Sequence, residues 1–186
     1  MLKAKIILFI SALASLTGCG AVVSLHPLAI PNGKDTVFDP ALVGTWEEAK
    51  AERDGTKDRY TIDRAESGYS VKLVAESTKG EGTMHLMKVG NRLLLDILCP
   101  SDGAPPPVHL FFRLRLEKDT AWVSGMDSSW LQDQIEASGL PRHEVLTDDW
   151  DRMVLTASSA ELRRHLLPYV GDNKSFSEET ELHRVK

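Results

Sequence analysis

Apolar and polar residues alternate along much of the chain, in short segments separated by Gly, Asn, Asp and Pro. The clearest example is 108–117, where one face of an extended chain carries Val108, Leu110, Phe112, Leu114 and Leu116. Such alternation predicts half-buried β-strands. Further strands are expected from 44 onward and at 59–63, 69–75, 83–89, 93–98, 120–126, 152–156 and 181–186, with a turn at 79–82. Consecutive short strands with short turns predict an antiparallel meander.

Helical periodicity is confined to the C-terminal half of the chain. A first helix is expected over 130–138, with Asp127 or Ser128 as its N-cap. A second helix is expected to start from a capping box at Ser158 and to end within 168–171. We therefore expect a mainly β (α+β) fold, in which an antiparallel meander, able to close into a barrel, carries two helices packed on it.

The N-terminus has the layout of an export signal. Lys3 and Lys5 precede an apolar run over 6–16, and its 11 residues are too few to span a bilayer as a helix. The stretch Leu16-Thr17-Gly18-Cys19 then resembles the bacterial lipobox. This resemblance implies that the Cys19 sulfur receives a diacylglycerol, that residues 1–18 are removed, and that the new amine is acylated, for example with palmitate.

Three parts of the chain follow from this interpretation. Residues 1–18 are a lipoprotein signal peptide, 19–38 a lipidated N-terminus and tether, and 39–186 a single β-rich domain. The tether contains apolar residues, including Val22 and Leu28, that could dock on the domain. Two or three acyl chains give a stable anchor. We expect the protein on the exported side of the cell membrane or outer membrane, and the outer membrane is favoured in Gram-negative bacteria because Gly, and not Asp, follows Cys19.

The net charge limits which partners are expected, and the cysteine content limits which disulfides can form. Without Lys3 and Lys5, 20 basic residues face 27 acidic ones, a net charge of −7, so a nucleic-acid partner is not expected. Arg113 and Arg115 are expected together on a solvated strand face. If Cys19 is acylated, Cys99 has no partner for an intramolecular disulfide, and we expect it to be buried or held near Pro100.

The two ends of the domain carry a short motif in common with a known group of barrels. Gly44-Thr45-Trp46 follows a helical turn that starts at Asp39, and this stretch resembles the start of lipocalin-like (calycin) barrels. The resemblance implies that Trp46 closes the barrel floor and packs near an Arg of the last strand, for which Arg184 is available. The stretch from Asp39 to Trp46 also resembles uncharacterised bacterial lipoproteins, a likeness that implies no activity.

No residue constellation in the sequence indicates catalysis. The six His residues lack metal-ligand spacing, although His85 and His109 could meet across a sheet. Neither a Gly-rich phosphate loop nor a Gly-x-Ser-x-Gly elbow is present. We therefore expect no enzyme activity, no cofactor and no metal site.

Two functions remain open for a membrane-anchored envelope lipoprotein. The first is a structural or protein-interaction module with an envelope protein as partner, suggested by the proline-rich loop at 100–107 and by helices that could fill the space of a ligand. The alternative is lipocalin-like binding of a small apolar ligand or lipid inside the barrel. Interior volume separates the two, because ligand pockets typically measure ~300–1,000 Å³.

Overall fold

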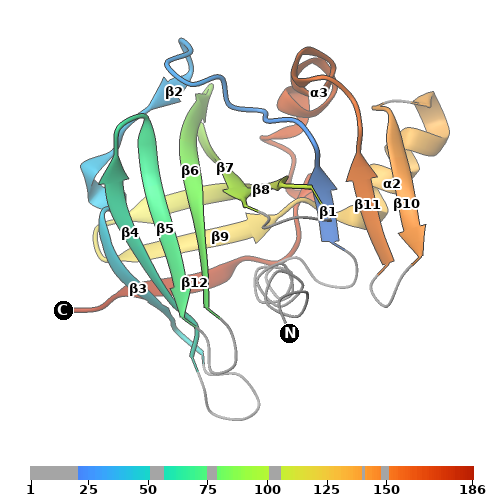
Figure 1. Cartoon of the computed structure of the whole chain (residues 1–186). Helices are drawn as coiled ribbons and strands as arrows, with labels where there is room; N and C mark the ends of the chain where they lie inside the picture. Colours follow the sequence, from blue (N-terminus) through green and yellow to red (C-terminus); the bar gives the residue numbers. More distant parts are fainter. Residues whose placement is uncertain (1–20, 51–56, 75–78, 101–105, 140, 148–150) are drawn as a thin grey trace.

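Eight antiparallel strands close into a barrel (Figure 1), in a computed structural model that describes residues 21–50, 57–74, 79–100, 106–139, 141–147 and 151–186. In ring order the strands are β3 (Gly44–Glu48), β4 (Arg59–Ala65), β5 (Gly68–Val74), β6 (Lys79–Val89), β7 (Arg92–Cys99), β8 (Val108–Glu117), β9 (Thr120–Gly125) and β12 (Thr180–Arg184). Strand β12 lies between β9 and β3 and closes the ring. The predicted mainly β fold with a lipocalin-like barrel and two helices is confirmed.

The alternation along β8 places its side chains as predicted. The interior face carries Val108, Leu110, Phe112 and Leu114, which belong to the main core inside the barrel. Strand β7 is buried on both faces, with Leu95 and Ile97 in this core and Leu94 in a second one. Because other elements cover the outside of β7, the strand is apolar on both sides, as predicted for a central strand.

The turn predicted at 79–82 is wrong, because these residues begin strand β6. Gly80 is paired with Leu73, and Gly82 with Val71. A Cβ atom at Gly82 would lie 2.6 Å from the carbonyl oxygen of Leu98 on the next strand. Glycine is required there by the close approach of two backbones and does not mark a turn.

Three further strands and two helices form a layer beside the barrel. Strands β10 (His143–Thr147) and β11 (Asp151–Leu155) continue the sheet through β1 (Ala21–Ser24), which joins β8 by the pair Ser24–His109. The helices are α2 (Ser128–Ser138), with Asp127 as N-cap, and α3 (Ser159–Leu166), with Ser158 as N-cap. Short elements complete the fold: β2 (Thr36–Val37), η1 (Pro40–Leu42), η2 (Leu167–Tyr169) and η3 (Asn173–Ser175). Strand β10 is not foreseen by the sequence pattern.

A second core lies between the outer face of the barrel and the two helices. Met87, Leu94 and Phe111 point outward from the barrel strands and are buried with Leu131 and Ile135 of α2 and Leu162 and Leu166 of α3. The helices therefore cover the barrel from outside, as expected for helices packed on it, and they do not occupy its interior. Among the described residues, none of the helices has the length and apolar character needed to cross a membrane.

The two ends of the barrel differ, and we name them by their residues. The clasp end carries η1 and the turns at 66–67, 90–91 and 118–119. At the opposite, loop end, β4 and β6 begin and β5 and β7 end. In Figure 1 the connection between β6 and β7 lies at the top, and the starts of β4 and β6 lie at the bottom.

Candidate functional site

The segment from 21 to 38, in which we expected a tether, is built into the fold. Strand β1 pairs in parallel with β11 over its full length, and β2 pairs with β6. Val22, Val23 and Leu28 are buried. Fully burying one such side chain contributes about 1.5–3 kcal/mol, so the segment gains several kcal/mol by docking. Its described part is packed on the domain, as its apolar residues allow.

A buried carboxylate holds this segment against the barrel. Asp96 is 1 % exposed and lies on the outer face of β7. The backbone N–H groups of Leu28 and Ala29 donate to its Oδ2 at 2.7 and 2.8 Å. Its Oδ1 lies 2.7 Å from Nδ1 of His109. An ionised carboxylate only accepts hydrogen bonds, so the imidazole Nδ1 donates. Three donors thus offset the cost of burying the charge.

Helix α3 adds a second attachment of the same segment. Arg163 donates from Nη1 to the carbonyl oxygen of Leu28 at 2.7 Å, and its Nη2 pairs with the Asp35 carboxylate. The backbone of Asp35 in turn accepts from Lys88 N at 2.8 Å. We refer to Asp96, His109, Arg163 and Asp35, with the backbone of 28–29, as the latch. The latch joins the N-terminal segment to β6, β7, β8 and α3.

The chemistry of the latch is that of an attachment. A carboxylate–imidazole pair can orient a general base, but catalysis then needs a nucleophile within hydrogen-bond reach of the imidazole. The hydrogen bonds described for His109 include no Ser, Thr or Cys side chain. The second oxygen of Asp96 is already occupied by two backbone amides. These contacts fix the position of a chain segment on the outer face of the barrel.

At the clasp end, the structure brings Trp46 and Arg184 together. The guanidinium carbon of Arg184 lies 4.3 Å from the centre of the Trp46 ring. Its Nη1 donates to the carbonyl oxygen of Val43 at 2.7 Å, its Nη2 donates to Ala41, and its Nε donates to Asp119 at 3.1 Å. The indole N–H of Trp46 donates to Leu42 at 2.9 Å. These bonds tie η1 over the end of the barrel.

A steric requirement accounts for the glycine at position 44, at the clasp end. Its φ of +141° lies in a region that L side chains rarely adopt. A Cβ atom at this position would also overlap Nη1 of Arg184. The Gly-x-Trp motif therefore provides an aromatic face for the Arg184 guanidinium and leaves space beside it.

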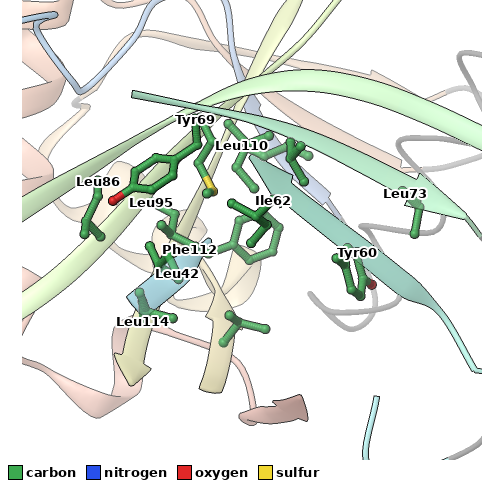
Figure 2. Packing of buried hydrophobic residues seen from close by; sticks show 14 of the residues in the cluster. Leu42, Tyr60, Ile62, Tyr69, Leu73, Leu86, Leu95, Leu110, Phe112 and Leu114 are labelled. Carbon is green, nitrogen blue, oxygen red and sulfur yellow. The ribbon is translucent and has the colours of Figure 1, made fainter. Parts of the chain in front are cut away.

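The interior of the barrel is apolar and nearly filled. Figure 2 shows Leu42 from η1, Ile62 from β4 and Phe112 from β8 directed into the same space. The remaining cavity measures about 50 Å³. It is lined by Leu42, Trp46, Tyr60, Ile62, Val71, Leu73, Met84, Leu95, Ile97, Phe112, Leu114, Ala121, Val123 and Leu182. Typical ligand pockets of ~300–1,000 Å³ are several times larger.

Cys99 is buried, as expected, with its side chain in the barrel core. Burial away from water, reinforced by the nearby negative charge of Asp96, raises the pKa of the thiol to about 12. The thiol therefore stays protonated near neutral pH, where only a thiolate would be a strong nucleophile. This environment does not activate Cys99 for chemistry.

The expectation of one solvated face for Arg113 and Arg115 is wrong for Arg113. Its side chain is 9 % exposed, donates to Asn173 Oδ1 at 2.9 Å and lies 4.8 Å from the ring centre of Phe176. Desolvation lowers the pKa of this guanidinium. Arg115 is solvated as predicted, and it pairs with Glu117 and Glu179. The segment around η3 covers Arg113, and the strand pattern alone does not reveal such a cover.

The other candidates from the sequence are distributed as follows. Cys19 lies outside the described residues. His85 is paired with Asp96 in the sheet register, so Asp96 stands between His85 and the β8 strand of His109. In the described part of the chain, no group of three potential metal ligands comes together.

Sequence reasoning missed Asp96, although a lone carboxylate in the apolar run Leu93–Leu98 is a signal that could have identified it.

Comparison of the chain with protein-family models, with curated proteins and with solved structures finds no match.

Proposed function

We propose that the protein is a lipid-anchored component of the bacterial cell envelope whose barrel serves as a structural or protein-interaction module. The anchor is the acylated Cys19 of the lipobox-like stretch. The barrel stands on the exported side of the membrane, and the outer membrane is its site in a Gram-negative cell. The module has no catalytic activity, and its partner is an envelope protein.

The filled interior of the barrel is the observation that carries this proposal. A cavity of about 50 Å³ bounded by side chains of the core leaves no room for a lipid or another drug-sized ligand. The polar groups of the clasp and the latch are engaged within the protein. The outer surface is then the part of the domain that is available to a partner.

A test of the anchor uses the full chain expressed in a Gram-negative host. We expect the intact mass of the purified protein to show loss of residues 1–18 and addition of a diacylglyceryl group and an acyl chain. Cys19→Ser should leave the membrane fraction or remain unprocessed. Full membrane retention of a correctly cleaved Cys19→Ser protein would refute the anchor.

A second test distinguishes an interaction module from a carrier. Protein purified from its native membrane is extracted with organic solvent, and the extract is examined by mass spectrometry. We expect only the covalent anchor and no stoichiometric apolar molecule. The alternative of ligand binding is motivated by the wholly buried, largely apolar lining of the cavity. It would be supported by a stoichiometric ligand whose recovery falls in Ala121→Leu, a variant that fills the interior.

A further inference from the structure

The part of the sheet beside the barrel ends in an open edge. Strand β10 is the last strand of the sheet, and in the described part of the chain it is hydrogen-bonded to β11 alone. In Figure 1 it is the outermost strand on the right of the molecule. Its pairs with β11 run from His143–Leu155 to Thr147–Asp151 without a bulge. Such an edge offers unpaired backbone groups to another strand.

A hydrogen bond next to β10 shows which of its backbone groups face outward. The N–H of Thr156 donates to the carbonyl oxygen of Arg142 at 2.9 Å, so these two residues form a hydrogen-bonded pair. Along an antiparallel ladder such pairs alternate with pairs that exchange no hydrogen bond. His143, Val145 and Thr147 therefore exchange none with β11. Their N–H and C=O groups point to the open side of the sheet.

The other side of β11 gives the same assignment. Leu155 is paired with His143, and its carbonyl oxygen accepts from the N–H of Leu25 at 3.0 Å. This carbonyl group is turned toward the side of β1 and so away from β10. The backbone groups of His143 consequently have no bond to it.

Val145 lies at the centre of the open edge. Its partner Met153 is buried in the second core, whereas Val145 is 52 % exposed and Glu144 beside it is exposed as well. The strand contains neither Lys nor Pro, which protect many natural sheet edges from pairing. An exposed β-branched residue between open backbone groups suits the addition of a strand.

We propose that β10 pairs with β10 of a second copy of this chain, antiparallel about a two-fold axis at Val145. Val145 then lies opposite Val145 of the second copy, and His143 lies opposite Thr147. All of these residues turn their backbone groups to the open side, so each pair exchanges two hydrogen bonds. Glu144 lies opposite position 146 and away from its own counterpart. The same surface serves both copies, as a two-fold dimer requires.

The lipid anchor favours a second copy as the occupant, and for this step the inference rests on the proposed function. Strand β1, which begins two residues after Cys19, is the third strand from the open edge. In the dimer, five strand intervals of ~4.8 Å separate the two β1 strands by about 24 Å. A two-fold axis along the membrane normal places both at the same height, so both anchors reach one bilayer.

The small size of the contact makes the pairing depend on the membrane. Strand β10 has five residues, and their ladder covers far less than the ~1,200–2,000 Å² of a stable interface. Anchoring holds all copies in one layer and raises their effective concentration. We therefore expect dimers on the membrane and monomers when each copy is isolated in a detergent micelle.

Disulfide formation at the axis tests the pairing. In a hydrogen-bonded antiparallel pair the Cα atoms are ~5.5 Å apart, within the range of a disulfide. V145C, E144C and V74C are each prepared as the full acylated chain and oxidised in phosphatidylethanolamine–phosphatidylglycerol vesicles. E144C controls the register, and V74C is a matched exchange of a valine that is 46 % exposed on β5. Cys99 is buried and does not compete.

We expect V145C to form several-fold more disulfide dimer in vesicles than E144C or V74C, and to lose the dimer in excess detergent. Equal yields at the three positions, or no dimer at 145, would overturn the pairing. In native membranes, a V145C adduct with a different protein and no dimer of this chain would assign the edge to another partner and overturn it as well.

A second experiment blocks the edge without touching the ladder to β11. V145P removes one N–H group from the open side, and Pro is tolerated on edge strands. V145K places two ammonium groups at the axis and needs no change of backbone. Chains labelled at V74C with one fluorophore should bleach in two steps on a supported bilayer, and in one step when either variant is added. Two-step bleaching in V145K would contradict the proposal.

The mass of the same preparations separates the pairing from the proposed function. Acylated protein that forms no V145C dimer overturns the pairing and leaves the anchor intact. Protein without acyl groups overturns the anchor, and the pairing is then decided in concentrated solution, where V145C dimers support it and their absence overturns it.

Discussion

Replacement of Asp96 tests whether the latch is a principal attachment of the N-terminal segment. Asp96→Ala leaves three buried donors without an acceptor: Nδ1 of His109 and the backbone N–H groups of Leu28 and Ala29. Each unsatisfied buried donor costs about 1–3 kcal/mol. We expect a loss of about 3–5 kcal/mol, since relaxation and water recover part of the sum. At ~2–4 °C per kcal/mol for a domain of this size, the melting temperature falls by roughly 10 °C.

Asp96→Asn is the matched control, because the amide keeps the shape of the carboxylate. Its oxygen accepts from Leu28 and Ala29, and its N–H donates to an unprotonated Nδ1 of His109. Loss of the charge then costs at most about 2 kcal/mol. Urea unfolding followed by circular dichroism measures both variants, and hydrogen exchange at residues 28 and 29 reports on the latch itself. An Ala variant within 1 kcal/mol of the parent protein, or an Asn variant as unstable as the Ala variant, would refute this account.

Three further variants or measurements probe the clasp, the core and the connection to β5. Gly44→Ala forces a Cβ atom onto Arg184 and should lower the free energy of unfolding by about 3 kcal/mol. The control Gly90→Ala, at φ +61° with open space around it, should lower it by only about 1 kcal/mol. Similar losses in the two variants would exclude the steric argument. The thiol of Cys99 should not react with a maleimide at pH 8 in the folded protein and should react fully in urea, and labelling of Cys99 in the folded protein would contradict its burial. Because the folded-state pKa is raised to about 12, the stability from this group is complete below the unfolded pKa of ~8.5 and is lost as pH rises from there toward 12. Tyr69→Phe removes the hydroxyl that accepts from Asp39 N at 2.6 Å and donates to Asp39 O at 3.1 Å, so thermal unfolding should show a loss of about 1–2 kcal/mol; a neutral effect would mean that water replaces both bonds.

The strands could be predicted because each barrel strand has one face in a single interior. In β8, residues 108, 110, 112 and 114 all point inward, and the sequence of the strand therefore alternates between apolar and polar residues. The contact of Arg184 with Trp46 could be predicted for a similar reason. A closed barrel places its first and last strands side by side, so motifs at the two ends of the domain can meet.

The features that the sequence did not reveal depend on elements packed from outside. Arg113 occupies an outward position, and only the segment around η3 decides that it is buried. Gly82 suggested a turn because the approach of β7 to its Cα is a tertiary feature that no local pattern contains. The lone carboxylate of Asp96 in an apolar run is visible in the sequence, but its partners are not, because the backbone amides of 28–29 have no signature there.

The position of the latch has a mechanical meaning under the proposed function. A lipid that pulls on Cys19 loads the chain at Ala21, where β1 enters the sheet beside β11. If β1 were peeled from the sheet, the next residues under load would be those that bond Asp96 and Arg163. Breaking these bonds leaves a buried carboxylate and a guanidinium without hydrogen-bond partners. This costs more free energy than exposing aliphatic side chains alone. A polar network, rather than more apolar surface, is therefore suited to the point at which a domain must resist being drawn away from its own anchor.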